Sequence, residues 1–572
     1  MRRPASFILA VSTLCFSSCG HAQQQTVNSP FEYREVYLPE WKSEEGHQLH
    51  LNSVDRDWGI WGHNLSVVLP KNPSPSVYAK QGNILIHDQF CFSSETLFEY
   101  IKDYINDNYG KDRTTRFAIL PNDNSVVCKC GRCTELGNKD GDASGAVYHL
   151  LERLAEEFPR HIFFSSYYRT TSSLPRRRLP ENAGVLISAM SFPLSPVHTS
   201  QEDRFAELLN RWSEFTDRIY IWDYLNNFDD YFTPFPIFDV AQRRLRLYED
   251  SGVKGVFFNG SGMDYSSMHI LKTRVLAAML SDPYVEWRPL LKELCHEEYP
   301  VAGNLISEYM EKQEDMTAER GTLLPLYEGL PAALKTYLWA DEFIRFHNAL
   351  DSLLPTISEP EYSRVLKMDR ALMLTHLEIN RISADTTGCV RMLDQLEKLI
   401  DQGTTSYSES GGSIRDYVED YRNMLKHAEK VGRKNLLKGV RLEPLTALDE
   451  EYRDISIITD GLLGLPSNYH CGQMLSSATP SLRIAVPNVK GMKSLCVNMT
   501  RNAIFHIAFP LRVSLSADGQ VLGEKEPKAS ADNLQHASVE FDIPSNCKGT
   551  LVLTIFRNQE ERTMAIDEIE GF

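Results

Sequence analysis

The chain has 572 residues, too many for one ordinary domain, and this length leads us to expect about three to four domains. Its 77 acidic side chains outnumber its 60 basic ones, which gives a formal net charge of −17 at pH 7. Binding of nucleic acid requires concentrated Lys and Arg, so this balance argues against a nucleic-acid partner. Beyond the amino-terminal segment, no apolar run approaches the ~20 residues that are needed to span a bilayer.

The amino terminus predicts a bacterial lipoprotein. Residues 1–18 combine a basic start, an apolar run and small residues directly before Cys19. This arrangement is typical of a lipoprotein signal peptide, with Cys19 as the lipidation site; an ordinary cleaved signal peptide is the alternative. Residues 19–30 then form a polar tether. We therefore expect a protein that is anchored to a membrane of the bacterial cell envelope, in the periplasm or at the outer membrane surface.

Between residues 31 and 300, strand-like apolar runs alternate with amphipathic helical segments. This alternation predicts parallel strands that are joined by right-handed crossovers. The pattern fits a (β/α)8 TIM-like barrel in which one strand is missed or lost. A doubly wound open sheet is the alternative, although no glycine-rich dinucleotide loop follows any strand. The predicted strands are residues 31–37, 59–69, 117–120, 161–168, 184–190, 218–224 and 254–260.

The segment 117–133 is where we expect chemistry to be presented. Its apolar start predicts a buried strand, and Pro121 ends that strand. Asn122 and Asp123 then project just beyond the carboxyl end of the strand. In α/β folds, active sites lie at this edge.

Closely spaced cysteines follow in the same segment. Cys128, Cys130 and Cys133 have the crowding of a thiolate metal site, for which Cys91 is the first candidate as a fourth ligand. In an oxidising envelope, buried or disulfide-paired cysteines are the alternative. We favour this alternative, and we predict neither a metal nor a cofactor.

Two further domains are predicted after the barrel. Residues 301–435 form a purely helical pattern in which Leu and Met recur at spacings of three and four, as is typical of a helix-bundle core. Residues 448–572 consist of short alternating strands with turn residues between them, which predicts a β-sandwich.

Polar and aromatic residues that follow the predicted strands are expected to meet at the mouth of the barrel. Aromatic rings stack on the apolar faces of sugars, while amides and carboxylates bind the sugar hydroxyls. We therefore predict a glycan site with Asp123 and Asp223 as its catalytic acids. For each of them, a structural role in a turn or at the sheet edge is the alternative. The predicted substrate-binding residues are Trp58, His63, Asn64, Asn122, Tyr167, Trp222, Tyr224, Asn227 and Asn259.

In these segments the chain resembles the bacterial domain of unknown function 4838, whose members look like glycoside hydrolases with α-glucuronidase-like barrels. The resemblance covers roughly residues 55–300. Its carriers are WGHNL (61–65), PNDNSVVCKCGRC (121–133), SGAVYHLLERLAEEF (144–158), IYIWDYLNNFDDYFTPFP (219–236) and GVKGVFFNG (252–260).

The same group overlaps glycoside hydrolase family 163, which contains endo-β-N-acetylglucosaminidases that act on complex N-glycans. The resemblance implies cleavage between two N-acetylglucosamines, with the acetamide of the substrate as nucleophile. Asp123 and Asp223 then share the acid and orienting roles. Many relatives carry acids after the fifth and the last strand, whereas residues 187–195 and 257–262 contain none. A non-catalytic surface glycan-binding lipoprotein with a degenerate barrel is therefore the alternative.

The carboxyl-terminal segments 458–474, 513–523 and 565–572 resemble a discoidin-type carbohydrate-binding module. Such a module usually displays an aromatic platform, yet no tryptophan follows Trp339, and Gln473 stands where relatives often carry one. A scaffold role for the sandwich is therefore the alternative to glycan binding.

Overall fold

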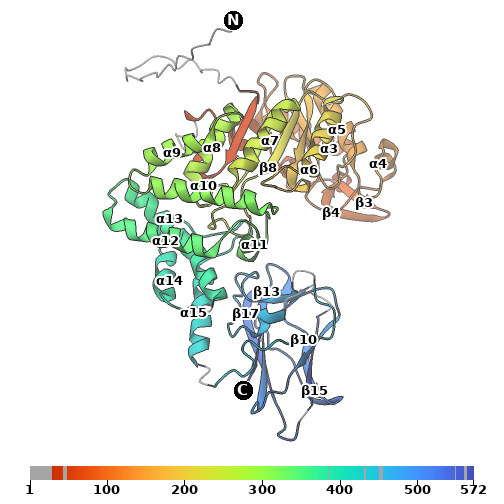
Figure 1. Cartoon of the computed structure of the whole chain (residues 1–572). Helices are drawn as coiled ribbons and strands as arrows, with labels where there is room; N and C mark the ends of the chain where they lie inside the picture. Colours follow the sequence, from red (N-terminus) through yellow and green to blue (C-terminus); the bar gives the residue numbers. More distant parts are fainter. Residues whose placement is uncertain are drawn as a thin grey trace.

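The computed structural model shows an α/β part, a helical part and a β-sandwich at the carboxyl end (Figure 1). The predicted signal peptide, Cys19 and nearly all of the tether lie outside the described residues. No helix within the described ranges is long and apolar enough to cross a membrane. The described residues are 29–42, 48–383, 385–430, 433–449, 452, 455–547, 549–558 and 563–572.

The α/β part is built on a curved sheet of seven parallel strands. The spatial order is β1-β9-β8-β7-β6-β5-β2. From β2 to β9, each strand therefore lies beside the next strand of the sheet along the chain, as in a TIM-type barrel, whereas β1 lies beside the last strand, β9. Every predicted strand segment contributes one of them. They are β1 (Tyr33–Tyr37), β2 (Trp58–Ile60), β5 (Arg116–Ala118), β6 (Ile162–Tyr167), β7 (Ala183–Ser188), β8 (Ile219–Tyr224) and β9 (Gly255–Asn259).

The predicted eight-stranded closed barrel is not confirmed, because among the described strands no ladder joins β1 to β2. Side chains bridge these two edges instead. The ring of Tyr33 on β1 meets the ring of Trp58 on β2 edge-on, with centroids 5.8 Å apart. The buried carboxylate of Glu35 on β1 accepts a hydrogen bond from the backbone N–H of Val54, which lies shortly before β2. Bulky rings and a carboxyl group thus hold the edges together without a backbone ladder.

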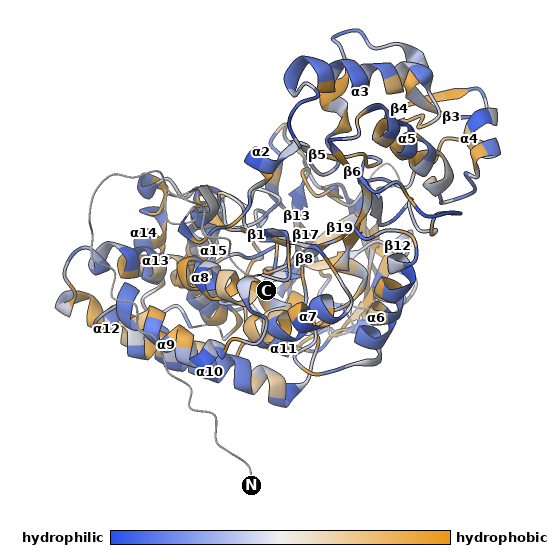
Figure 2. Ribbon diagram, turned by 90° about the horizontal axis from the view of Figure 1, so that it is seen from above, coloured by the Kyte–Doolittle hydropathy of each residue, from blue (hydrophilic) through white to orange (hydrophobic). Residues whose placement is uncertain are grey.

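Amphipathic helices cover the outer face of the sheet. In α5, for example, the buried side chains Val147, Leu150, Leu151 and Leu154 recur at spacings of three and four, which places them on one face. Figure 2 shows hydrophilic and hydrophobic residues interleaved along such helices. The longer helices between the strands and after β9 are α3 (Glu95–Asn108), α5 (Ser144–Glu157), α6 (Ser200–Ser213), α7 (Phe238–Asp250) and α8 (His269–Ser281). Two short helices, α2 (Val54–Asp57) and α4 (Gly131–Leu136), also lie between strands.

An antiparallel hairpin stands between β2 and β5, and the sequence analysis did not predict it. It consists of β3 (Tyr78–Gln81) and β4 (Ile84–Phe90). The predicted strand over residues 59–69 is therefore only the short β2, followed by a 3-10 helix over Leu65–Val68. The hairpin packs on the segment 121–133, where the backbone N–H of Lys129 donates to the carbonyl of Lys80 at 2.7 Å.

The helical part extends the core of the α/β part. One continuous cluster of buried apolar side chains runs from Val36 on β1 to Ile379 in the helical part. A second cluster joins Tyr224 of β8 to Tyr417 and Cys471, so the sandwich segment also contributes. The helices of this part are α9 (Trp287–Glu298), α10 (Gly303–Arg320), α11 (Gly329–Thr336), α12 (Ala340–Leu353), α13 (Glu361–Ile382), α14 (Cys389–Glu397) and α15 (Ile414–Lys430).

The carboxyl-terminal part is a sandwich of two largely antiparallel sheets that enclose one apolar core, as predicted. In β18, for example, Leu551, Leu553 and Ile555 are buried and alternate with half-buried residues. One sheet contains β10 (Glu443–Pro444), β12 (Ser481–Val486), β18 (Leu551–Phe556), β15 (Arg512–Ala517) and β16 (Gln520–Lys525). The other contains β11 (Met474–Ser476), β19 (Thr563–Gly571), β14 (Ile507–Ala508), β13 (Ser494–Asn502) and β17 (Leu534–Asp542).

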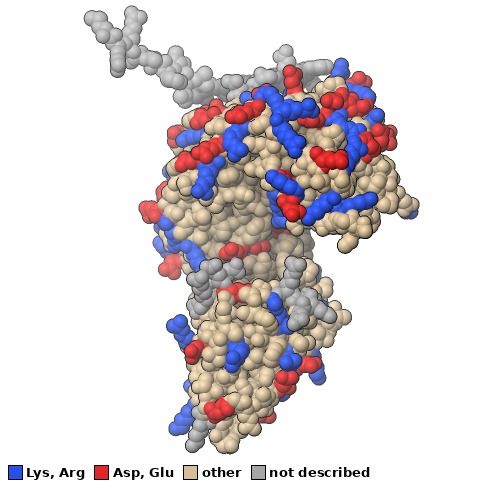
Figure 3. All heavy atoms as spheres, turned by 90° about the vertical axis from the view of Figure 1, so that its right-hand side faces the viewer, with Lys and Arg blue, Asp and Glu red and all other residues tan. Residues whose placement is uncertain are grey.

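On the face shown in Figure 3, Lys and Arg mix with Asp and Glu over the upper part of the molecule, and the sandwich below carries fewer charges.

The side chain of Gln473 in the sandwich segment is buried, and its amide donates to the carbonyl of Leu465 at 2.7 Å. An aromatic platform is therefore not presented at this position.

Candidate active site

A cavity of about 260 Å³ opens at the carboxyl ends of the parallel strands. Active sites of barrel-like α/β folds lie at this end because side chains from several strands converge there. Larger hollows lie along α4 and α5 and along α14, and no residue of a parallel strand lines them. The cavity is lined by His63, Leu120, Asp123, Ser166, Tyr168, Leu186, Ser188, Met190, Trp222, Tyr224, Asn259, Tyr327 and Glu409.

The alternation along each strand decides which predicted residues enter the cavity. On β8, Trp222 and Tyr224 point to the inner side and line the cavity, so Asp223 between them points to the outer side. On and after β6, Ser166 and Tyr168 line the cavity, whereas Tyr167 packs against the ring of Trp212 outside the sheet, with centroids 5.7 Å apart.

Asp223 ties β8 to the helix behind it. Its buried carboxylate forms an ion pair with Arg244 of α7 at 2.5 Å. It also accepts hydrogen bonds from the Tyr248 hydroxyl at 2.5 Å and from the backbone N–H of Tyr224 at 2.9 Å. The structure thus places Asp223 behind the sheet and out of the cavity, which corrects the expectation that it acts as a catalytic acid. Its buried ion pair and hydrogen bonds are those expected from the alternative interpretation, in which Asp223 has a structural role.

Asp123 lies where the sequence analysis expects it, after β5 and in the wall of the cavity. Its half-exposed carboxylate pairs with the guanidinium of Arg169 at 3.0 Å. Asn122, the residue before it, is turned away, because its side-chain amide donates to the carbonyl of Asp88 at 3.0 Å. Asn122 therefore holds the loop and does not line the cavity.

The remaining predicted residues divide between the cavity, its floor and its surroundings. His63 lines the cavity, and its Nδ1 lies 2.5 Å from the carbonyl oxygen of Pro121, in the loop that carries Asp123. Trp58 is buried below in the interior of the sheet. Asn64 is exposed at the start of the 3-10 helix that follows β2 and stays outside the cavity. Asn259, at the end of β9, lines it.

Among the lining residues that the sequence analysis did not select, Tyr327 and Glu409 come from outside the α/β part. Both come from loops of the helical part, which hydrogen bonds fix to the loop after β8. The backbone N–H of Phe228 donates to the carbonyl of Leu326 at 2.7 Å, and the N–H of Glu409 donates to the carbonyl of Phe228 at 2.8 Å. The buried side chain of Asn227 donates to the carbonyl of Tyr327 at 3.0 Å, so Asn227 positions a wall residue without lining the cavity itself.

The two carboxylates of the cavity lie in different environments. Burial raises the pKa of Glu409 above its ordinary value. The Tyr327 hydroxyl, which donates to Glu409 at 3.3 Å, opposes this rise, and the nearby carboxylate of Asp229 adds to it. Asp123, by contrast, is paired with a guanidinium. A carboxyl group with a raised pKa beside a carboxylate that is paired with a guanidinium is an arrangement that acid–base chemistry uses.

No local signal marks Glu409 in the sequence. It lies in the serine- and glycine-rich segment 404–413, which reads as an ordinary loop. Only the contact of this loop with the β8 loop brings it to the strand ends. Tyr168, in contrast, could be found from the period of two along β6, counted from buried Phe164.

The sequence model of the family described as "Domain of unknown function (DUF4838)" matches residues 9–311, more than half of the chain. The chain belongs to this family. No curated protein matches it.

Solved structures that match this member of the family do so at low similarity. A family 115 4-O-methyl-α-glucuronidase with specificity for decorated arabinogalactans is 11% identical, with a TM-score of 0.36, over 84% of this chain and 67% of the other. A glucosidase from Croceicoccus marinus is 8% identical, with a TM-score of 0.15, over 82% and 83%. The K2 cleaved adhesin domain of Lys-gingipain is 12% identical, with a TM-score of 0.14, over 18% and 69%. Similarity at this level does not assign an activity to the chain.

Proposed function

We propose that this protein hydrolyses glycosidic bonds, with Glu409 and Asp123 as its two acids. One observation carries the proposal: carboxylates from two distant parts of the chain line a single cavity at the strand ends, together with aromatic rings. Glycoside hydrolysis typically needs a pair of carboxyl groups that flank the scissile bond, and it needs no metal or nucleotide motif.

The walls of the cavity suit a sugar ring. Trp222, Tyr168 and Tyr224 offer aromatic surface for the apolar face of a sugar, while Asn259 and Ser188 offer hydrogen bonds to its hydroxyls. The Ser188 and Tyr224 hydroxyls lie 3.0 Å apart and can share one such contact. The cavity volume of about 260 Å³ lies just below the range of about 300–1,000 Å³ that is common for small-molecule sites, so it suits a short unit of a glycan.

The roles of the two acids follow from their surroundings. Glu409 is the general acid, because burial favours the protonated form that donates to the leaving-group oxygen. Asp123, beside Arg169, then acts as the negatively charged partner. It can activate water, attack the sugar directly or orient an acetamide of the substrate. As the glycosidic bond breaks, the proton of Glu409 passes to the leaving oxygen, and water finally supplies the new hydroxyl of the sugar.

The substrate that we propose is a glycan that contains N-acetylglucosamine, including complex N-glycans of glycoproteins. The support for this choice is that the segments 61–65, 121–133 and 219–236 resemble a group that overlaps glycoside hydrolase family 163, in which endo-β-N-acetylglucosaminidases are found. Glu409 replaces Asp223 in the proposed acid pair. The lining residues at the ends of β7 and β9 are Ser188, Met190 and Asn259, none of which is acidic. Glu409 therefore supplies an acid that these strand ends lack.

The experiment is to incubate the purified protein with a complex N-glycoprotein and with a panel of aryl glycosides, and to detect released sugar by mass spectrometry. Glu409→Gln and Asp123→Asn should each lower kcat/KM about 10²–10⁴-fold. Glu419→Gln, at an exposed site on α15, should leave it unchanged. Full activity of the Glu409→Gln variant would refute the proposed acid. Binding of glycan without release by the unmodified protein would support the non-catalytic alternative.

A further inference from the structure

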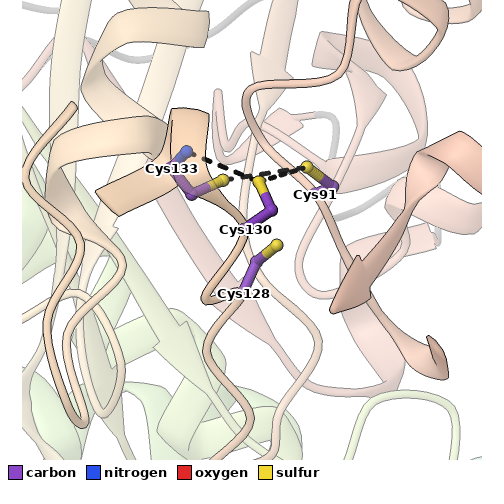
Figure 4. Close-up of side chains that lie close together, drawn as sticks. All are labelled: Cys91, Cys128, Cys130 and Cys133. Atoms are coloured by element: carbon purple, nitrogen blue, oxygen red, sulfur yellow. Dashed lines mark hydrogen bonds between the residues drawn. The ribbon is translucent and has the colours of Figure 1, made fainter. Parts of the chain in front are cut away.

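Four cysteines gather beside the loop that carries Asp123. Cys91 follows β4, Cys128 and Cys130 lie in the loop, and Cys133 lies in the short helix α4 (Gly131–Leu136). Figure 4 shows their side chains converging from these separate segments, and all four Sγ atoms lie within 4.8 Å of one another. Among the described residues, this is the only group of three or more His, Cys, Asp or Glu side chains with such spacing.

The distances between the sulfur atoms suit a bound metal better than a disulfide. The Sγ of Cys91 lies 3.7 Å from the Sγ atoms of both Cys130 and Cys133. A disulfide bond needs about 2.05 Å. Four sulfurs that each lie ~2.3 Å from a central zinc ion form a tetrahedron with edges of about 3.8 Å, and the two distances from Cys91 match this edge length.

The surroundings supply what a thiolate site requires. Cys91, Cys128 and Cys133 are buried, and Cys130 is partly exposed. Backbone N–H groups point at two of the sulfurs: Lys80 donates to Cys128 at 3.3 Å, and Cys133 donates to Cys130 at 3.5 Å. Such donors stabilise thiolate charge around a metal ion and orient its ligands.

We propose that Cys91, Cys128, Cys130 and Cys133 bind one structural zinc ion. With four protein ligands the tetrahedral site is closed, so its role is structural and not catalytic. Binding converts four thiols to thiolates and releases their protons to solvent. The ion joins the β3–β4 hairpin to the segment 121–133, which also carries Asp123. This site replaces the buried or disulfide-paired cysteines that the sequence analysis favours.

The first test measures zinc without any substrate, so its result does not depend on the proposed function. The full chain is expressed in zinc-supplemented medium and purified through a tag that binds no metal. Elemental analysis should then give about one zinc per chain, and X-ray absorption should give four sulfur neighbours at ~2.3 Å. Cys133→Ser should lower the zinc content at least tenfold, whereas Cys547→Ser, a partly exposed cysteine of the sandwich, should not.

A second measurement keeps the test decisive if the Cys133→Ser protein does not fold. The unmodified protein is denatured with a chelator and a thiol-alkylating reagent present, and its peptides are mapped by mass spectrometry. Four alkylated cysteines at these positions, together with zinc in the native protein, support the site. Disulfides among the four, or four free thiols in a native protein that holds no zinc after growth with zinc, would overturn it.

Discussion

At the scale of single residues, the place of a carboxylate relative to its strand decides what it can do. Asp123 lies beyond the end of β5, where the chain is free to turn its side chain into the cavity. Asp223 lies within β8, where the pleat sends it to the face opposite Trp222. Both aspartates form an ion pair with an arginine, but only the Asp223 pair is fully buried.

We expect Asp223→Asn to destabilise the fold, because it leaves the buried guanidinium of Arg244 without a counter-charge. Removing one partner of such a pair costs about 3–5 kcal/mol of unfolding free energy. Urea denaturation measures the change. The matched control is Asp217→Asn, which removes an exposed ion pair with Arg178 and should leave stability unchanged. A stable Asp223→Asn protein with a selective loss of kcat would argue for the catalytic role instead.

Glu35 gives a second prediction at this scale. Its carboxyl group is enclosed between β1 and β2, and burial raises its pKa from 4.5 to about 8. The hydrogen bonds from Tyr33 and Val54 oppose this rise but do not cancel it. The folded protein therefore keeps this proton up to about pH 8, whereas the unfolded chain releases it near pH 4.5. Stability should consequently fall as the pH rises through that window.

Glu35→Gln should remove this pH dependence, because its neutral amide needs no proton. The difference in unfolding free energy between variant and unmodified protein should change by on the order of 4 kcal/mol from pH 5 to pH 8, in favour of the variant at pH 8. Denaturation curves at several pH values measure it. Glu99→Gln, at an exposed position on α3, serves as the control. If the free energies of unfolding of the Glu35→Gln and unmodified proteins changed with pH in the same way, the prediction would be contradicted.

At the scale of elements, a close approach of two helices positions the end of the cysteine loop. A Cβ atom added to Gly145 in α5 would lie 2.3 Å from the backbone carbonyl oxygen of Leu136, the last residue of α4. Only glycine allows this contact, because backbone atoms cannot move aside as a flexible side chain can. The same helix α4 carries Cys133.

Gly145→Ala should therefore destabilise the protein by about 1–3 kcal/mol, as overpacking does. Gly131→Ala, at the start of α4, is the matched control, because nothing lies within 4 Å of its added Cβ. Chemical denaturation of both variants measures the difference. Equal free energies of unfolding for the two variants would show that α4 can shift away from α5 without loss of stability.

Most helices and strands of the α/β part can be predicted from the sequence, but some cannot. The patterns along the sequence located every strand of the parallel sheet and predicted that helices alternate with these strands. The β3–β4 hairpin was missed, although Gly82 and Asn83 between its strands form a recognisable two-residue turn. Closure of the barrel could not be predicted, because β2 is short and side chains, not a ladder, hold it beside β1.

At the scale of the whole molecule, the three parts meet around the cavity loops. Asp229, in the loop after β8, accepts hydrogen bonds from the backbone of Glu328 in the helical part at 2.8 Å and pairs with His470 near the sandwich at 2.9 Å. The sandwich thus braces the loops that present Tyr327 and Glu409.

The amino terminus gives a prediction at this scale. If Cys19 is the lipidation site, Cys19→Ala should move the protein from the membrane fraction to the soluble fraction and abolish labelling by a fatty-acid analogue. Cys15→Ala is the matched control, because Cys15 lies within the predicted signal peptide and should leave anchoring intact. Cell fractionation and metabolic labelling measure both. A Cys19→Ala protein that stays in the membrane would contradict lipid anchoring through this residue.

The sequence by itself determined the strand and helix order, the placement of Asp123 after β5 and the crowding of three cysteines, because these depend on neighbours within a few residues. The tertiary structure decided the rest. It turned Asp223 behind the sheet and brought Glu409 to a cavity whose other walls come from distant parts of the chain. It also placed Cys91, which the sequence offered only as a candidate, beside the three other cysteines. These outcomes depend on which loops and faces come into contact, and local periodicity carries no record of such long-range contacts.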